Sequence, residues 1–245
     1  MTQYKKSFTC LMGCLLVALL GASCKHTADT PPRAVVRDGV AITLKDQKLT
    51  VIKDGKKVKD YSISSSKFGM GSSHGSNRTP LGIHAVTKKI GDGQPSGMVF
   101  KGCRPTGEVV KADAGRDPIV TRVIQLAGLE PFNKNSHSRR IYIHGTPEER
   151  YIGRPASYGC IRMRSRDVLD LYPLVYRGMP VDIESCSQAT YLKAEKKAAP
   201  TVVIPDEVVA KLPLEKIGSS PKYRRYRRNG IAQRRGNAAK VNRRG

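Results

Sequence analysis

The chain has 245 residues, of which 39% are hydrophobic and 26% charged, with 44 Lys and Arg against 20 Asp and Glu. This composition is typical of a globular protein, and the length allows a buried core without stabilising metal ions. The one long apolar stretch, residues 10–20, is too short to cross a bilayer, so a multi-span membrane protein is excluded. The net charge of +24 favours polyanionic partners, namely nucleic acid, anionic lipid or acidic wall polymers, and composition does not choose among them.

The N-terminus is typical of an exported protein. A basic start, the apolar run 10–20 and the small residues 21–23 describe a secretory signal. The segment resembles a bacterial lipoprotein signal, in which the Cys after the cleavage point is lipidated, although Gly21 stands where that pattern usually has Leu. We therefore predict a signal peptide over residues 1–23, lipidation of Cys24, and a protein of the cell envelope or periplasm, held to the membrane by its lipid. The alternative is that the signal peptide is cleaved close to this position without lipidation, which would release a protein that is not anchored.

The next segments predict a linker and then strands. Residues 25–38 are polar, contain a Pro pair and are expected to be a linker. From Val40 onward apolar residues alternate with polar ones, and Asp54-Gly55 lies between two such runs, which predicts a β-hairpin. Further short apolar runs, each expected to be a strand, occupy residues 83–86, 98–100, 119–126, 141–144 and 181–183.

Many short strands joined by turn-rich segments predict an all-β, or mostly β, sandwich or barrel with one or two short helices. The helix with the clearest pattern lies within residues 165–175, with Ser165 as its cap. The folded domain is expected to span residues 39–186, followed by a weakly ordered, basic extension over residues 187–245.

The C-terminal residues 222–245 hold ten Lys and Arg and no acidic residue, and are expected to be disordered. Basic and aromatic residues alternate there, as in proteins that bind single-stranded nucleic acid. Export argues against nucleic acid and favours anionic lipid or wall polymer as the partner of this tail. A solvated tail without a partner is the alternative.

Once the signal peptide is removed and Cys24 is lipidated, Cys103, Cys160 and Cys186 remain. An odd number of cysteines in an exported protein suggests an intermolecular pair or a thiol kept free for chemistry. Cys103 and Cys186 are interpreted as buried thiols or as a pair. No set of residues has the spacing of metal ligands, so neither a metal nor a cofactor is expected.

The strand predicted at residues 141–143 delivers His144, and Cys160 follows sixteen residues later within a Gly-containing turn. A thiol of ordinary pKa near 8.5 is only about 3% thiolate at pH 7. A neighbouring imidazole can take its proton, and Arg162 would favour the anion. Spacing alone thus suggests a nucleophile and its base, with a buried structural thiol as the alternative.

The residues themselves are more specific than their spacing. They resemble the catalytic signature of the L,D-transpeptidase family (YkuD type), in which a His-Gly pair precedes, by about fifteen residues, a Ser/Thr-His-Gly-Cys motif followed by an apolar residue and Asn or Arg. The matching residues are His144, Gly145, Ser157, Gly159, Cys160, Ile161 and Arg162, with further matches at Thr79–Gly82, Thr121, Arg122 and Asp167. The resemblance covers roughly residues 39–184. It departs from the family at Tyr158, where the motif has His, and we interpret this Tyr as a tolerated variant.

The resemblance implies a cell-wall enzyme that acts on peptidoglycan stem peptides through a cysteine thioester. Cys160 would be the nucleophile and His144 the general base. The main-chain carbonyl of Gly145 would orient the imidazole, and backbone N–H groups at Gly159 and Cys160 would form the oxyanion hole.

Three further residues are placed on the substrate side of the site. Arg162 is expected to recognise a stem carboxylate, and Tyr158 to shape the site beside the nucleophile. Ser157 is expected to support the turn that carries Cys160. An L,D-carboxypeptidase or a wall-anchoring transferase would use the same residues, and a non-catalytic envelope-binding protein is the alternative from another class.

Overall fold

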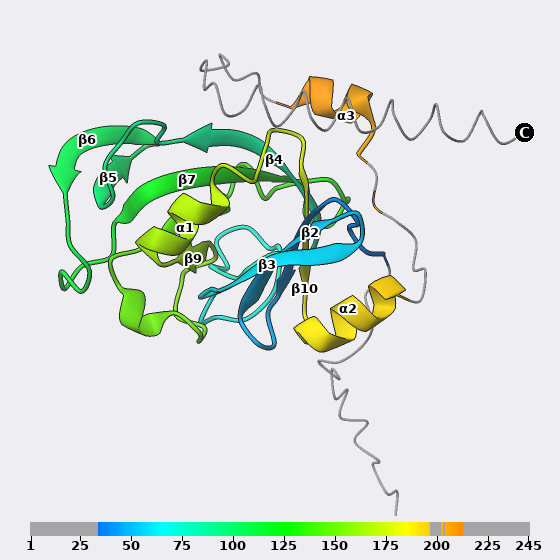
Figure 1. Ribbon diagram of the computed structural model, residues 1–245. Coiled ribbons are helices and arrows are strands. Elements are labelled where there is room, and N and C mark those ends of the chain that lie inside the picture. The colour runs from blue at the N-terminus through cyan, green and yellow to red at the C-terminus, as the bar shows by residue number, and fades with distance from the viewer. Residues whose placement is uncertain (1–33, 197–201, 203, 213–245) are drawn as a thin grey trace, which may run out of the picture.

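The computed structural model describes residues 34–196, 202 and 204–212. The predicted signal peptide, the lipidation site at Cys24, most of the predicted linker and the basic tail lie outside the described residues. Within them the chain is mostly β, with a single large mixed sheet and a few short helices (Figure 1). The predicted fold class is therefore confirmed.

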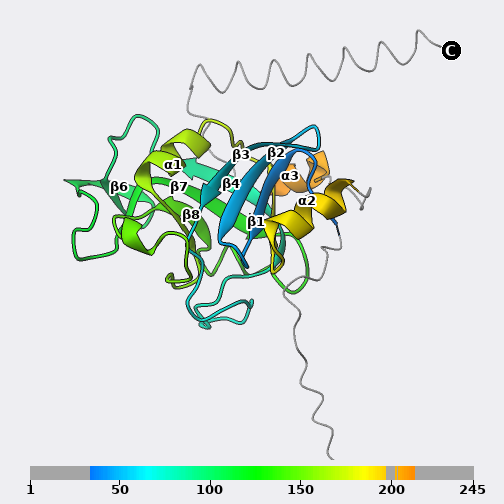
Figure 2. The same cartoon turned by 60° about the horizontal axis from the view of Figure 1, so that its bottom comes forward.

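The ten strands of the described residues form one sheet that branches at β7. In sheet order they are β3 (Lys56–Ser62), β2 (Lys48–Lys53), β1 (Gly39–Thr43), β10 (Pro180–Glu184), β4 (Gly82–Ile90), β7 (Ile119–Gly128), β5 (Met98–Lys101) and β6 (Arg104–Val109). On the branch, β8 (Tyr142–Gly145) pairs with β7, and β9 (Ile161–Met163) pairs with β8. Figure 2 shows β1, β2 and β3 running side by side at one end of this sheet.

The predicted hairpin is the β2–β3 pair. Its turn residues Asp54 and Gly55 have φ of 50° and 70°, the left-handed values that a tight two-residue hairpin turn requires. Asp tolerates this conformation better than most residues and Gly adopts it without strain.

One core holds the branch against the rest of the sheet. Val40 of β1 and Leu49 of β2 are buried in the same cluster as Ile143 of β8 and Ile161 of β9. Burial of such side chains contributes about 1.5–3 kcal/mol each, so β8 and β9 are held firmly in place.

The predicted helix within residues 165–175 is α1 (Ser165–Leu171), which packs on β7 and β8. The expectation that Ser165 caps it is wrong, because Arg164 is the N-cap residue and makes no side-chain cap. The Ser165 hydroxyl is instead hydrogen-bonded to Thr121 Oγ1 over 2.8 Å. A single-turn 3-10 helix, η1 (Glu149–Tyr151), precedes this region.

The structure differs from the sequence-based expectation at both ends of the domain. Val35 and Val36 fall within the predicted linker, yet both are buried, in a cluster with Tyr191. Tyr191 belongs to α2 (Gln188–Lys196), in a segment that was expected to be weakly ordered. Its hydroxyl donates to Asp182 (2.8 Å) and accepts from the Val36 N–H (3.0 Å), a buried contact that no local pattern signals. Helix α3 (Asp206–Lys211) follows α2 in the chain.

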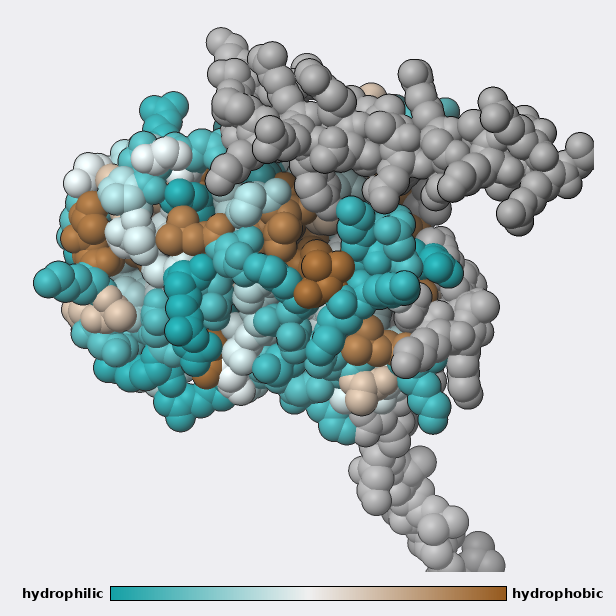
Figure 3. Space-filling model, in the orientation of Figure 1, coloured by the Kyte–Doolittle hydropathy of each residue, from teal (hydrophilic) through white to brown (hydrophobic). Residues whose placement is uncertain are grey.

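The surface is largely hydrophilic on the face seen in Figure 3, with apolar side chains in small separate groups. No helix in the described part of the chain is long and apolar enough to cross a membrane. The large apolar side chains that remain exposed among the described residues are Val58, Phe68, Val109, Phe132 and Tyr158.

Candidate active site

The parallel pairing of β8 with β9 brings the predicted catalytic residues to one face. Ile143 is opposite Ile161, and His144 is opposite Arg162. Side chains alternate along a strand, so Ile143 and Ile161 enter the main core while His144 and Arg162 point to the other face. Cys160 immediately precedes β9, two residues before Arg162, and therefore also lies on that face, diagonally across from His144.

His144 is buried, and its ring is oriented by the main chain. Nδ1 donates to the carbonyl oxygen of Gly145 over 2.9 Å, because a carbonyl can only accept. In the neutral ring this leaves Nε2 with a lone pair that can accept a proton. Burial lowers the pKa of His144 to about 4, opposed in part by the Gly145 carbonyl, so the imidazole is neutral at neutral pH.

Gly145 itself lies against a bulge in β7. A Cβ added there would be 2.6 Å from the carbonyl oxygen of Val120 and 3.0 Å from Thr121 Cβ, so only glycine fits. The β7–β8 register shifts between Val120 and Val123, and Thr121 has a φ of 69°, an unusual value for a β-branched residue. This bulge therefore shapes the backbone that orients His144.

Cys160 is partly exposed, and its thiol donates to the carbonyl oxygen of Arg140 over 3.3 Å. Burial raises the pKa of the thiol to about 11, while the Tyr142 N–H and the guanidinium groups of Arg162 and Arg139 act in the opposite direction. The thiol is therefore protonated and the His144 imidazole neutral at neutral pH. Among the hydrogen bonds of the described residues, none joins Cys160 Sγ to His144. Catalytic hydrogen bonds of this kind are often long or poorly aligned before substrate binds.

The turn that carries Cys160 is held by Ser157. Its hydroxyl donates to the Cys160 carbonyl over 2.6 Å and accepts from the Gly159 N–H over 3.2 Å. These two hydrogen bonds join Ser157 to both Gly159 and Cys160 of the turn, and Ser157 is buried. Gly159 has a φ of 118°, which other residues rarely adopt, and its N–H, one of the two predicted oxyanion donors, is bonded to Ser157 in this structure.

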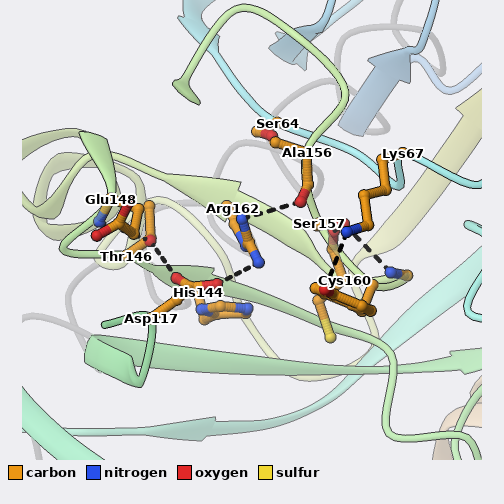
Figure 4. A network of polar contacts seen from close by, with 12 residues as sticks. Ser64, Lys67, Asp117, His144, Thr146, Glu148, Ala156, Ser157, Cys160 and Arg162 are labelled. Carbon is orange, nitrogen blue, oxygen red and sulfur yellow. Dashed lines mark hydrogen bonds and ion pairs between the residues drawn. The ribbon is translucent and has the colours of Figure 1, made fainter. Parts of the chain in front are cut away.

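Arg162 differs from its predicted role. Its guanidinium is largely covered, with 8% of the side chain exposed, and forms an ion pair with Asp117. It also donates to the Ala156 carbonyl over 3.2 Å, and Asp117 accepts a further hydrogen bond from Thr146 over 2.6 Å (Figure 4). A covered cation that already has a carboxylate partner does not fit recognition of a stem carboxylate, so we reinterpret Arg162 as a residue that positions the loops around His144.

Tyr158 is exposed and has a cation as its partner. Lys67 Nζ donates to the Tyr158 hydroxyl over 2.9 Å and lies 4.3 Å from the centre of its ring. This contact lowers the pKa of Tyr158 below its ordinary value. The ring centroid of Phe68 is 5.5 Å from that of Tyr158.

Sequence reasoning missed Asp117 and Lys67. Asp117 lies in a polar stretch before β7 and Lys67 in a turn after β3, and neither belongs to a motif or a periodic pattern. Only the fold brings them beside the predicted residues.

Cys103, Cys160 and Cys186 are all free thiols. In the described ranges, no three His, Cys, Asp or Glu side chains are grouped so that they could hold a metal ion.

Three solved structures similar to this chain are L,D-transpeptidases. That of Xylanimonas cellulosilytica is 21% identical, with 62% of this chain and 63% of that chain covered and a TM-score of 0.41. That of Mycobacterium smegmatis is 16% identical, with 59% and 57% covered and a TM-score of 0.39. For that of Enterococcus faecium, the identity is 19%, the coverage 61% and 50%, and the TM-score 0.40. The chain thus spans less than two thirds of the length of each. No curated protein matches the sequence.

The match to a protein family is more direct than these likenesses. Residues 37–183 match the family described as the L,D-transpeptidase catalytic domain, YkuD, over more than half of the chain. The matched range includes every strand from β1 to β9, helix α1 and the whole His144–Cys160 site. The chain belongs to the L,D-transpeptidase catalytic domain family.

Proposed function

We propose that the protein is a peptidoglycan L,D-transpeptidase that uses Cys160 as its nucleophile and His144 as its base. The observation that carries the proposal is the shared face of β8 and β9, on which a protonated thiol lies diagonally across from an imidazole whose Nδ1 is fixed by Gly145. The free lone pair at Nε2 is what a general base requires, and the neutral state of the ring keeps it available at neutral pH.

In the first half-reaction Cys160 Sγ attacks the carbonyl carbon of the third stem residue while its proton passes to His144 Nε2. The oxyanion that forms is bound by backbone N–H groups of the Cys160 turn. As the intermediate collapses, the C–N bond breaks, and the imidazolium returns the proton to the amine of the departing D-amino acid. A thioester on Cys160 remains.

In the second half-reaction an amine of a second stem attacks the thioester and His144 takes the amine proton. The C–S bond breaks, the new amide is released, and the proton returns to sulfur. Water in place of the amine would give carboxypeptidase activity with the same residues.

The test is incubation of the full chain with purified muropeptides, followed by mass spectrometry. Crosslinked dimers support transpeptidation, whereas stems shortened by one residue without dimers would replace it with carboxypeptidase activity. Cys160→Ala and His144→Gln are expected to abolish product, with Cys103→Ala as the matched control thiol that leaves it unchanged. A carbapenem, which mimics the acyl donor, should add its mass to the wild type and not to Cys160→Ala. Absence of both product and adduct in the folded wild type would refute the proposal.

We propose export to the cell envelope as the setting for this reaction, supported by the secretory pattern of residues 1–23. Fractionation of cells that express the full chain, with Cys24→Ala as the comparison, tests it. Membrane association that depends on Cys24 would support the lipid anchor, and cytoplasmic recovery of the uncleaved chain would contradict export.

A further inference from the structure

The pairing of Arg162 with Asp117 leaves the proposed enzyme without its expected carboxylate-binding residue. Stem peptides carry carboxylates close to the bond that is cut, and a site that distinguishes them needs an accessible cation. We propose that Lys67, held on Tyr158 beside Phe68, binds a carboxylate of the donor stem peptide. This inference rests on the proposed function and assigns part of its substrate recognition to a residue outside the family motif.

Lys67 has the donors that such a contact needs. An ammonium group has three N–H donors, and the hydrogen bond to the Tyr158 hydroxyl uses one of them. Lys67 is exposed, and no carboxylate of the described residues lies within ion-pair distance of its Nζ. Two N–H donors of this exposed side chain are therefore available to a ligand, next to Tyr158 in the turn that carries Cys160.

The contact with Tyr158 also gives the cation a defined position. Nζ lies 4.3 Å from the centre of the Tyr158 ring and 5.3 Å from that of Phe68. A lysine fixed by a ring and a hydroxyl has already lost part of the rotamer freedom that a free lysine gives up on binding.

The backbone ties Lys67 to the nucleophile turn. Its N–H donates to the Ser157 carbonyl over 3.1 Å. The Thr79 hydroxyl accepts from the Ser66 N–H over 3.0 Å and donates to the Gly159 carbonyl over 3.1 Å. The turn that carries Lys67 and the turn that carries Cys160 are thus linked directly, and Figure 4 shows Lys67 and Arg162 on opposite sides of Ser157.

The two rings supply an apolar surface next to the cation. Tyr158 is 58% exposed and Phe68 44% exposed, so together they form an apolar pair at the surface, not part of the core. A stem residue combines an aliphatic part with a carboxylate, and this surface presents a matching aromatic face and ammonium.

Arg139, the other cation that acts on Cys160, is less suited to this role. Its guanidinium donates to the Gly71 carbonyl over 3.2 Å and to the Arg78 carbonyl over 2.7 Å. These bonds hold two loops together. Lys67, by contrast, has two N–H donors that its bond to Tyr158 does not use.

The experiment compares three donor tetrapeptides: one with all carboxylates free, one amidated at the terminal D-residue, and one amidated at the side-chain carboxylate of the third residue. For Lys67→Gln we expect kcat/KM on the free peptide to fall about tenfold, mainly through KM. One of the two amidated peptides lacks the carboxylate that Lys67 binds, and on that peptide Lys67→Gln should change kcat/KM less than twofold. The peptide that shows this small effect therefore identifies the bound carboxylate. Tyr158→Phe should give a smaller loss of the same kind.

Lys56→Gln on exposed β3 is the matched control and should alter none of these values. An equal loss on all three peptides, or no loss on any, would overturn the proposal. Binding of the same peptides to Cys160→Ala, measured by calorimetry, separates this inference from the proposed function. If binding depends on Lys67 and carboxylate but the wild type turns nothing over, the subsite stands and the catalytic proposal fails. If the wild type turns over all three peptides and no binding difference is seen, only the subsite fails.

Discussion

Asp117 and Arg162 form an ion pair beside His144, and the same carboxylate accepts the hydrogen bond of Thr146. The pair joins the segment before β7 to β9 and to the residue that follows β8. Asp117 raises the pKa of His144 and Arg162 lowers it, so the pair keeps the electrostatic effect of either charge on the base small.

Replacing Asp117 by Asn should remove the charge that raises the pKa of His144 and leave the Arg162 charge that lowers it. The covered Arg162 charge would lose its partner, which costs about 1–3 kcal/mol of stability, and the pKa of His144 would fall further. The acid limb of the pH profile of kcat/KM is therefore expected to move to lower pH. Urea unfolding and the pH profile measure the two effects. Glu108→Gln, which breaks the exposed Arg116–Glu108 pair, is the control and should change neither. A profile unmoved by Asp117→Asn would contradict this role.

Stability should fall as the pH is lowered from 7 to 5. Burial lowers the pKa of both His144 and His84 to about 4, against 6.5 for an ordinary histidine. The unfolded chain therefore binds more protons between these values, so each histidine destabilises the fold by about 2 kcal/mol at pH 5 relative to pH 7. Below about pH 4 the folded protein binds these protons too, and the loss levels off. Chemical unfolding at several pH values checks this, and equal midpoints at pH 7 and pH 5 would disprove it.

Ser157→Ala should loosen the nucleophile turn. The substitution removes the partner of both the Cys160 carbonyl and the Gly159 N–H, so we expect about 1 kcal/mol of lost stability and a fall in kcat of about 10- to 100-fold. Ser138→Ala removes an exposed hydrogen bond to Asn135 and serves as the control. Unchanged turnover in Ser157→Ala would show that the turn holds its shape without the hydroxyl.

Tyr158→His restores the residue that the family motif carries, and we expect activity to stay within about tenfold of the wild type. Tyr158 is largely exposed and makes its polar contact through Lys67, so the substitution disturbs no buried packing. A stem-peptide exchange assay measures the effect. Complete loss of exchange would show that Tyr158 is required and not a tolerated variant.

Local pattern predicted the parts of the fold that depend on local chemistry. The Asp54-Gly55 turn, the strand before His144 and the helix after Arg164 each follow from neighbouring residues. Strand β6 was missed because every residue in it is exposed, and it forms only because β5 offers backbone partners. Helix α2 was missed because its Ala- and Lys-rich sequence has a weak apolar pattern, and it is held instead by Tyr191.

The residues of the candidate site also fall into two groups, those that the sequence motif identifies and those whose roles depend on the fold. His144, Gly145 and Cys160 were recognised from residue identity at a defined spacing. The roles of Arg162 and Lys67 depend on which charges lie nearby in space, and no sequence rule places Asp117 next to Arg162 or Lys67 next to Tyr158.

The start of the folded unit contacts a residue close to its C-terminal side. The Val202 N–H donates to the Val35 carbonyl over 2.9 Å, and Tyr191 ties Val36 to β10. Residues 34–36 and Val202 therefore lie side by side, while the chain goes on from Val202 to α3, whose following residue Leu212 is hydrogen-bonded to Arg177. A force applied at residue 34 would load β1 first, because β1 follows shortly after Val36, whereas the turn around Cys160 is carried by the separate β8–β9 branch.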